Sequence, residues 1–320
     1  MAVTGDVLVL RALGVGDLLV VVPALRALRA AHPDARITLA TPARLGELVT
    51  LTDAVDAVLD TPALAALRWP ADPPALAVNL HGRGPASTVE LLRTRPARLL
   101  AHADPVFPKI DGPPWRTDVS EVDRWCDLLR WHGIPADPDD LLLARPPVAS
   151  PAPGAVLVHP GAAFAARRWP AERFGTVARG LSDDGHQVLV TGSGDERPLI
   201  DAVVAAADRP GVRAAGPTGL TELAALVADA ALVVCGDTGI GHLATAYRVP
   251  SVLLFGPTPP ANWGPTIDQD RHVVLWQGET GDPFGAEPAP GLLRVGVPEV
   301  VTRARELLAF RGVPEGVGRG

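Results

Sequence analysis

The segment over residues 234–265 combines small, polar and apolar residues in an order suited to holding a phosphate. It has the pattern of an apolar strand, a turn with Asp237 and Thr238, a helix over residues 240–247, and a second apolar strand. Backbone N–H groups at a helix N-terminus bind anions because they point outward and carry partial positive charge. A lone histidine is more often structural than functional, but His242 lies within one helical turn of this loop. The turn therefore predicts a site for a nucleotide-type ligand.

Two further loops are candidates to contact the same ligand. Arg167 and Arg168 precede a helix predicted over residues 171–184, and a guanidinium can clamp a phosphate oxygen with two hydrogen bonds. Arginine is abundant in this chain, in which Lys109 is the only lysine, so an arginine at any one position is weak evidence of function. Arg167 and Arg168 could equally well be two solvated surface side chains. Glu196, in the loop TGSGDE, can accept hydrogen bonds from ribose hydroxyls, or can simply favour a helix N-terminus through its negative charge.

Asp17 is the candidate proton acceptor. It follows Gly14 and Gly16, which allow a tight turn between a strand and a helix. Capping that helix is the commoner role of an aspartate here, and it is compatible with a second role as a carboxylate that takes a proton from a substrate. The turn lacks the third glycine of a dinucleotide fingerprint, because Leu19 stands there, so a hydride-transferring oxidoreductase is disfavoured.

Alternating strands and helices must position these loops. A strand over residues 7–10, a helix over 18–32 and a strand over 36–40 open the chain, and a second series begins with a strand over 155–159. The stretch 135–153 between the two series is rich in Pro and Asp, which is typical of a linker.

Two such series predict an α/β protein of two Rossmann-like, doubly wound domains that face each other across a cleft. We expect the domains to span residues 1–147 and 148–320, with the option that the last helix, over 298–310, packs back on the N-terminal domain. In doubly wound sheets the ligand lies beyond the carboxyl ends of the strands, and every loop described above falls at such an end.

Composition narrows the classes of function. The net charge of −7 gives no general attraction to nucleic acid or to anionic lipid, so no nucleic-acid partner is expected. Cys126 and Cys235 are far apart and have no metal-type spacing, which argues against a disulfide framework. Neither a signal peptide nor an uncharged apolar run of spanning length is evident, so we expect a soluble cytoplasmic protein.

Four motifs together resemble glycosyltransferase family 9, the heptosyltransferases of lipopolysaccharide core assembly. They are LGVGDLLVVVPALRAL, HPGAAFAARRWPAERF, TGSGDE and DTGIGHLATAYRVPSVLLFGPTPPANWGP, and their order and spacing agree with the family over nearly the whole chain. The last motif is specific, whereas each of the others would be a weak signal alone.

The resemblance implies a GT-B fold in which the N-terminal domain receives the acceptor and the C-terminal domain holds a nucleotide-sugar. It implies inverting transfer of heptose or a related sugar without a metal or cofactor, from a donor that we expect to be ADP-linked, to a glycan or glycolipid. Peripheral contact with the inner membrane would accompany a glycolipid acceptor.

The same resemblance assigns roles to individual residues. Asp17 matches the catalytic base. The donor-binding positions are Arg167, Glu196, Asp237, Thr238, Gly239 and His242. The candidates on the acceptor side are Gly16, His81 and Arg83.

The chain departs from the family pattern in three respects. Its first turn reads LGVGD and is longer than the usual LGD turn. Ala162 and Ala163 stand where hydroxyl residues often follow the His-Pro-Gly sequence, and no basic surface for a phosphorylated acceptor is evident. Two other functions therefore stay open: a sugar-nucleotide epimerase with a GT-B-like fold, which needs no second substrate, and a nucleotide-sugar-binding protein without catalysis.

Overall fold

The computed structural model describes residues 4–311, and the chain divides into two compact units between Arg145 and Pro146. This division falls inside the Pro-rich stretch predicted as a linker. Each unit has its own parallel sheet, which confirms the prediction of two doubly wound α/β units. The expectation that the units face each other across a cleft stays a prediction.

The sheet of the N-terminal unit contains five parallel strands in the order β3-β2-β1-β4-β5. They are β1 (Asp6–Leu10), β2 (Arg36–Thr41), β3 (Ala57–Asp60), β4 (Leu76–Asn79) and β5 (Leu99–Leu100). Residues 7–10 of β1 are fully buried, as expected for a central strand covered on both faces. The chain passes from one side of β1 to the other between β3 and β4, so the strand order reverses between β1 and β4.

Short helices connect these strands. They are α1 (Val15–Leu19), α2 (Val22–Ala31), α3 (Gly46–Thr50), α4 (Ala86–Arg93) and α5 (Glu121–Trp131), with 3₁₀ turns at Ala43–Leu45 and Leu64–Ala66. The single helix predicted over residues 18–32 is therefore wrong. Pro23 lacks the N–H that a helix interior needs, and it lies in the first turn of α2, where that N–H is not required.

The sheet of the C-terminal unit contains six parallel strands in the order β11-β10-β9-β6-β7-β8. They are β6 (Val156–His159), β7 (Val188–Val190), β8 (Val212–Ala214), β9 (Leu232–Gly236), β10 (Ser251–Leu254) and β11 (His272–Leu275). Here the strand order reverses between the neighbours β6 and β9.

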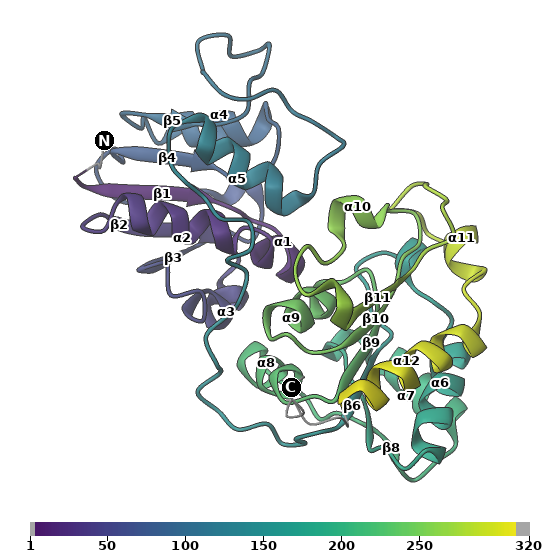
Figure 1. Ribbon diagram of the computed structural model, residues 1–320. Coiled ribbons are helices and arrows are strands. Elements are labelled where there is room, and N and C mark those ends of the chain that lie inside the picture. The colour runs from purple at the N-terminus through teal and green to yellow at the C-terminus, as the bar shows by residue number, and fades with distance from the viewer. Residues whose placement is uncertain (1–3, 312–320) are drawn as a thin grey trace, which may run out of the picture. The chain divides into compact units, whose positions relative to one another are not determined.

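Helices cover both faces of this sheet, with α6, α7 and α12 on one side and α8 and α9 on the other (Figure 1). The helices are α6 (Ala171–Asp183), α7 (Arg197–Ala207), α8 (Leu220–Ala228), α9 (Gly239–Ala246), α10 (Pro260–Trp263), α11 (Pro290–Leu293) and α12 (Val297–Arg311). The 3₁₀ turns are η3 (Ala165–Arg167), η4 (Gly194–Glu196) and η5 (Gln269–Arg271). The last helix, α12, packs against α6 and β10 of its own unit.

The core of the C-terminal unit lies under α6, α7 and α12. Trp169 and Phe174 are buried there and meet edge to face, with ring centroids 5.1 Å apart. This packing fixes the loop before α6 to the body of the unit. Throughout residues 4–311, no helix combines the length and the apolar character needed to cross a bilayer.

Candidate functional site

The predicted phosphate loop lies where the strand order of the C-terminal sheet reverses. His159 at the end of β6 pairs in register with Cys235 of β9, so the loops that follow these two strands start side by side. Asp237 comes directly after β9, and its N–H donates to the Leu254 carbonyl of β10 at 3.2 Å. An opening at such a reversal is the usual ligand site of doubly wound sheets.

The N-terminus of α9 faces this opening. Thr238 occupies the N-cap position with extended backbone angles (φ −157°, ψ 167°), but its side chain makes no capping hydrogen bond. The N–H of Gly241 donates to the Thr238 carbonyl at 3.0 Å. The N–H groups of Gly239 and Ile240, in the first turn, have no acceptor within the helix and are suited to bind an anion.

Arg167 lies beside Asp237. Its Nη1 is 3.8 Å from the Asp237 Oδ2 and 3.5 Å from the Asp237 carbonyl oxygen, so the two side chains pair loosely. The Nε of Arg167 is buried and has no hydrogen-bond partner among the described residues. A buried donor left without an acceptor costs about 1–3 kcal/mol, so Arg167 is suited to a ligand oxygen.

A close backbone approach brings Arg167 to the strand ends. A Cβ on Gly236 would lie 3.0 Å from the Arg167 carbonyl oxygen, and one on Gly256 would lie 3.3 Å from that of Ala166. Glycines at the ends of β9 and β10 thus let the η3 turn rest on the sheet. By contrast, the Nε of Arg168 donates to the Ala162 carbonyl at 2.8 Å, so this arginine holds the loop itself.

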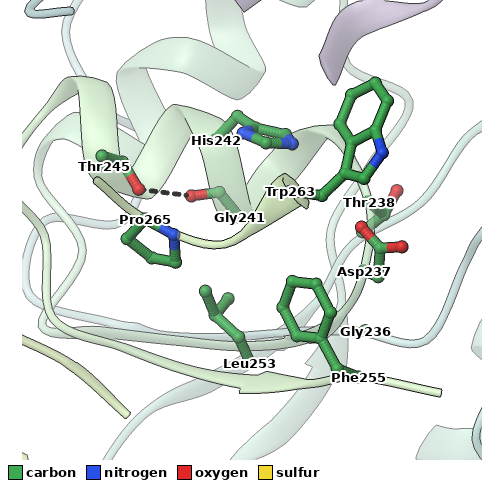
Figure 2. A pocket seen from close by; sticks show the side chains of 10 residues that line it. All are labelled: Gly236, Asp237, Thr238, Gly241, His242, Thr245, Leu253, Phe255, Trp263 and Pro265. Carbon is green, nitrogen blue, oxygen red and sulfur yellow. Dashed lines mark hydrogen bonds between the residues drawn. The ribbon is translucent and has the colours of Figure 1, made fainter. Parts of the chain in front are cut away.

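A small pocket beside the α9 N-terminus collects several of the predicted residues. In Figure 2, the carboxylate of Asp237 and the hydroxyl of Thr238 lie on one side of it, and Trp263 stands above them near His242. The rings of His242 and Trp263 meet edge to face with centroids 6.0 Å apart. Phe255 forms part of the floor. The pocket thus pairs acceptor and donor groups with an apolar wall, as small-molecule sites do.

Glu196 has a defined structural role. Its Oε2 accepts hydrogen bonds from the N–H and the hydroxyl of Ser193, at 2.8 and 3.1 Å, which caps the η4 turn. Its Oε1 rests against Gly161, where a Cβ would lie only 2.1 Å away. Glu196 thus lies at the N-terminus of α7, as its structural interpretation expects. The carboxylate of Glu196 also lies next to the loop after β6. The role of Glu196 in binding a ribose stays a prediction.

His159 is a further titratable group at this strand end. Its Nδ1 lies 3.0 Å from the hydroxyl of Thr191, which directly follows β7. Burial lowers the pKa of His159, and the nearby charge of Glu196 opposes that shift. A buried, neutral imidazole here braces the two loops that carry Gly161 and Glu196.

In the N-terminal unit, Asp17 is the third residue of α1. Its Oδ2 accepts a hydrogen bond from the Gly14 N–H at 3.2 Å, which closes the first turn. Its Oδ1 accepts one from Nη2 of Arg11 at 3.0 Å. The carboxylate keeps 29% of its surface exposed, so it combines the capping role with access for a substrate.

Arg11 was not among the predicted site residues. It follows the end of β1 and is only 2% exposed, and burial lowers the pKa of its guanidinium while Asp17 opposes that shift. Its Nη1 donates to the Leu80 carbonyl at 2.6 Å, and its guanidinium lies 4.9 Å from the ring centre of Trp125. The sequence signal that could have found it is a charged residue at the end of an otherwise apolar strand.

The three acceptor-side candidates occupy different positions. The Nδ1 of His81 accepts a hydrogen bond from the Ala12 N–H at 3.2 Å, and burial, followed by the charge of Arg11, lowers the pKa of the ring. His81 thus lies close to Arg11 and Asp17. Gly16 is half-buried within α1, and Arg83 is exposed on the loop after β4.

The structure therefore forms two groups from the predicted residues, one in each unit. The C-terminal unit brings together Arg167, Asp237, Thr238, Gly239 and His242, with Glu196 on the neighbouring loop. Trp263 and Phe255 were not among the predicted site residues, although both lie in the most specific of the four motifs. Over residues 4–311, no cluster of three or more His, Cys, Asp or Glu side chains has a metal-binding arrangement.

Sequence comparison finds relatives for the C-terminal half. The model of glycosyltransferase family 9 (heptosyltransferase) matches residues 139–286. Lipooligosaccharide heptosyltransferase 2 of Haemophilus influenzae is 34% identical over 125 residues, which cover 38% of this chain and 36% of that protein. The segment that matches thus covers little more than a third of the length of these curated relatives.

Structural comparison extends over both units. The ADP-heptose lipopolysaccharide heptosyltransferase II of Escherichia coli matches with a TM-score of 0.77 at 21% identity, over 96% of this chain and 100% of that chain. A glycosyltransferase family 9 protein of Veillonella parvula also gives 0.77, at 19% identity, over 97% and 100% of the two chains. At sequence identities of about 20%, this structural similarity shows that the two proteins share the fold of this chain.

The predicted GT-B fold class, of two Rossmann-like units, is thus confirmed. Together, the match of the C-terminal sequence and the likeness in fold identify the chain as similar to the heptosyltransferases of glycosyltransferase family 9.

Proposed function

We propose that the protein is an inverting, metal-independent glycosyltransferase. It moves heptose or a related sugar from a nucleotide-sugar donor to a hydroxyl of a glycan or glycolipid acceptor. The donor is ADP-linked, a choice supported by the ADP-heptose in the name of the E. coli structural relative. The enzyme acts in the cytoplasm, and a glycolipid acceptor would bring it into peripheral contact with the inner membrane.

One observation carries the proposal: the buried Nε of Arg167 lacks a hydrogen-bond partner among the described residues, and Arg167 lies beside Asp237, directly before the N-cap Thr238 of α9, whose side chain makes no capping bond. A diphosphate supplies the oxygens that both features require. A guanidinium binds phosphate with directed hydrogen bonds, and first-turn amides add their partial positive charge.

The transfer step follows from these groups. The acceptor oxygen attacks the anomeric carbon as the bond to the diphosphate breaks, and the bonding electrons leave with the diphosphate. Arg167 and the amides of Gly239 and Ile240 stabilise the charge that develops there. Asp17 takes the proton of the acceptor hydroxyl.

Nucleotide binding tests the donor site directly. We expect ADP to raise the melting temperature of the protein more than GDP, UDP or dTDP, and we expect the variant Arg167→Ala to lose the shift. Arg303→Ala is a matched control, because Arg303 pairs with Glu306 on the exposed side of α12, away from the α9 loop. A protein that none of the four nucleotides stabilises would contradict the proposed function.

The two alternatives give different products. An epimerase would isomerise the sugar of an ADP-heptose donor incubated alone, whereas a transferase would release ADP only with an acceptor, apart from slow hydrolysis. A protein that binds the donor and changes it under neither condition would be a binding protein. Mass and NMR analysis of the same incubations separates the three outcomes.

A further inference from the structure

The N-terminal unit contains a second pocket, which no part of the proposed donor chemistry uses. It lies between the segment that follows β5 and one face of α5. Its walls include His102, Pro113, Pro114, Val119 and Trp131. The space within these walls measures about 660 Å³, including the part that opens to solvent, which is enough for one sugar ring.

His102 supplies a fixed hydrogen-bond acceptor at this pocket. Its Nδ1 lies 3.2 Å from the Pro113 carbonyl oxygen, which can only accept, so Nδ1 carries the proton. The Nε2 then presents a lone pair, and it is buried without a partner among the described residues. Trp115 and Trp125 hold the ring from two sides, with centroids 4.9 and 5.7 Å from it.

The imidazole is also uncharged. Burial lowers the pKa of His102 to about 4, so the ring is neutral at physiological pH. In a neutral ring whose Nδ1–H donates to the backbone, Nε2 can only accept a hydrogen bond. The ligand group that suits it is therefore a donor, either a hydroxyl or an N–H. An ionised phosphate oxygen, which carries no proton, would meet the lone pair unfavourably.

The charged side chains that line this pocket form ion pairs. Each pairs with a side chain of opposite charge: Arg116 with Asp118 at 3.0 Å, Arg124 with Glu121 at 2.8 Å, and Asp127 with Arg130 at 3.0 Å. The guanidinium of Arg124 also lies 4.1 Å from the ring centre of Trp115, and one of its nitrogens donates to the Arg116 carbonyl. Each guanidinium at the pocket thus has a carboxylate partner and the pairs carry no net charge, which favours a neutral ligand.

An apolar wall completes the arrangement. Trp131 is 52% exposed, a large fraction for an indole, and it stands with Pro113, Pro114 and Val119 around the pocket. Aromatic and proline faces pack against the C–H surface of a sugar ring, while the few polar groups bind its hydroxyls. Apolar walls with a lone-pair acceptor and no net charge are complementary to an unphosphorylated sugar.

We propose that this pocket binds a neutral saccharide unit of the acceptor, with a sugar hydroxyl donating to Nε2 of His102 and a sugar face on Trp131. The assignment of this unit to the acceptor rests on the proposed function. The pocket is linked to the predicted base by direct contacts, because Arg11 bonds Asp17 and also lies on Trp125, which touches His102. The acceptor core recognised here is thus a neutral glycan.

Saturation-transfer NMR on the full chain tests the pocket without any transfer reaction. The probes are the methyl glycosides of mannose, glucose, galactose and glycero-manno-heptose, with mannose 6-phosphate and inorganic phosphate as the charged comparison. We expect at least one neutral glycoside to bind and the phosphorylated probes to bind more weakly. Trp131→Ala should weaken binding about tenfold, since a ring–sugar contact of about 1.4 kcal/mol corresponds to that factor.

A control variant and an NMR signal of His102 complete the test. Leu92→Ala removes another partly exposed apolar side chain of the same unit and should leave binding unchanged. In the wild-type protein the ¹⁵N resonance of His102 Nε2 should move when the glycoside binds, which needs no variant at a buried position. Equal binding by Trp131→Ala, a preference for the phosphorylated probes, or no binding by any glycoside would overturn the proposal. ADP binding, measured on the same samples, reports separately on the proposed function.

Discussion

Arg11 holds both the side chain and the backbone of Asp17. Its Nη2 donates to the Asp17 Oδ1 at 3.0 Å and its Nε donates to the Asp17 carbonyl at 2.9 Å, while Nη1 reaches the Leu80 carbonyl. One buried guanidinium thus ties the first turn of α1 to the chain leaving β4. A carboxylate fixed in this way presents its exposed edge in a single orientation, which a general base requires.

Asp17→Asn should lower turnover about 10²–10⁴-fold, the usual contribution of a general base, while ADP affinity stays near the wild-type value. The amide can still accept from Arg11 through its oxygen, but its nitrogen then faces the Gly14 N–H, donor against donor. A modest loss of stability should therefore accompany the loss of turnover. Steady-state kinetics and calorimetric titration with ADP measure the two effects, and unchanged turnover would remove Asp17 from the mechanism.

Arg11→Lys and Arg11→Met should separate positioning from folding. Lysine keeps a charge beside Asp17 but cannot bond Oδ1, the Asp17 carbonyl and the Leu80 carbonyl together, so turnover should fall without a matching change in donor KM. Methionine leaves those acceptors without their donor, and we expect a loss of about 1–3 kcal/mol in unfolding free energy as well. If Arg11→Lys turns over as fast as the wild-type protein, the directed hydrogen bonds of Arg11 do not position Asp17.

The donor loop could be predicted because its signals are local. A strand, a small-residue turn and a helix follow one another within residues 234–265, and the rule for doubly wound sheets then gives the edge on which the ligand lies. The same rule located Arg167 and Glu196. The missing cap at Thr238 was not predictable, because side-chain rotation at an N-cap is set by the surrounding packing.

The N-terminal site depends on contacts between distant parts of the chain. Arg11 and Leu80 meet only because β1 pairs with β4, and such pairing is invisible in a local pattern. In the sequence, Arg11 only interrupts an apolar run. The edge strands β8 and β11 were missed for a related reason, since strands this short are stabilised by one neighbour rather than by their own residues.

Gly161→Ala should weaken donor binding by displacing Glu196. The new Cβ would lie 2.1 Å from Oε1, so the carboxylate must move and release its bonds to Ser193. We expect about a tenfold loss of affinity for ADP-heptose, which corresponds to about 1.4 kcal/mol. Gly194→Ala in the adjoining loop is the control, because its Cβ would meet nothing within 4 Å. Equal affinities for the two variants would show that Glu196 does not contribute to the donor site.

Arg167→Lys tests whether directed hydrogen bonds or charge alone hold the diphosphate. Lysine keeps the positive charge but supplies no counterpart to the buried Nε, so ADP affinity should fall between that of the wild-type protein and that of Arg167→Ala. Calorimetric titration at two salt concentrations measures the difference. A lysine variant that binds ADP as tightly as the wild-type protein would reduce the role of Arg167 to a simple point charge.

Two buried histidines should make the protein lose stability in mild acid. Burial lowers the pKa of His102 and of His272 to about 4, from 6.5 for an exposed imidazole. Above pH 6.5 both rings are neutral in the folded and unfolded chains, so they add no pH dependence. Between pH 6.5 and 4 the unfolded chain binds protons that the folded chain does not, and each histidine lowers the unfolding free energy by about 1.4 kcal/mol per pH unit. Below about pH 4 the folded rings also protonate and the effect levels off.

The variants His102→Gln and His272→Gln test this prediction in separate units. His272 lies 2.8 Å from the Ser251 hydroxyl through Nδ1 and has a buried Nε2 without a partner among the described residues, so glutamine can keep one polar contact. Each variant starts from lower stability at pH 7, because it replaces a packed ring. Urea unfolding at pH 7, 6 and 5 should nevertheless give a shallower pH dependence for each variant, and the two changes should add because the residues belong to different units. A double variant as acid-sensitive as the wild-type protein would show that carboxylates, not these histidines, control acid unfolding.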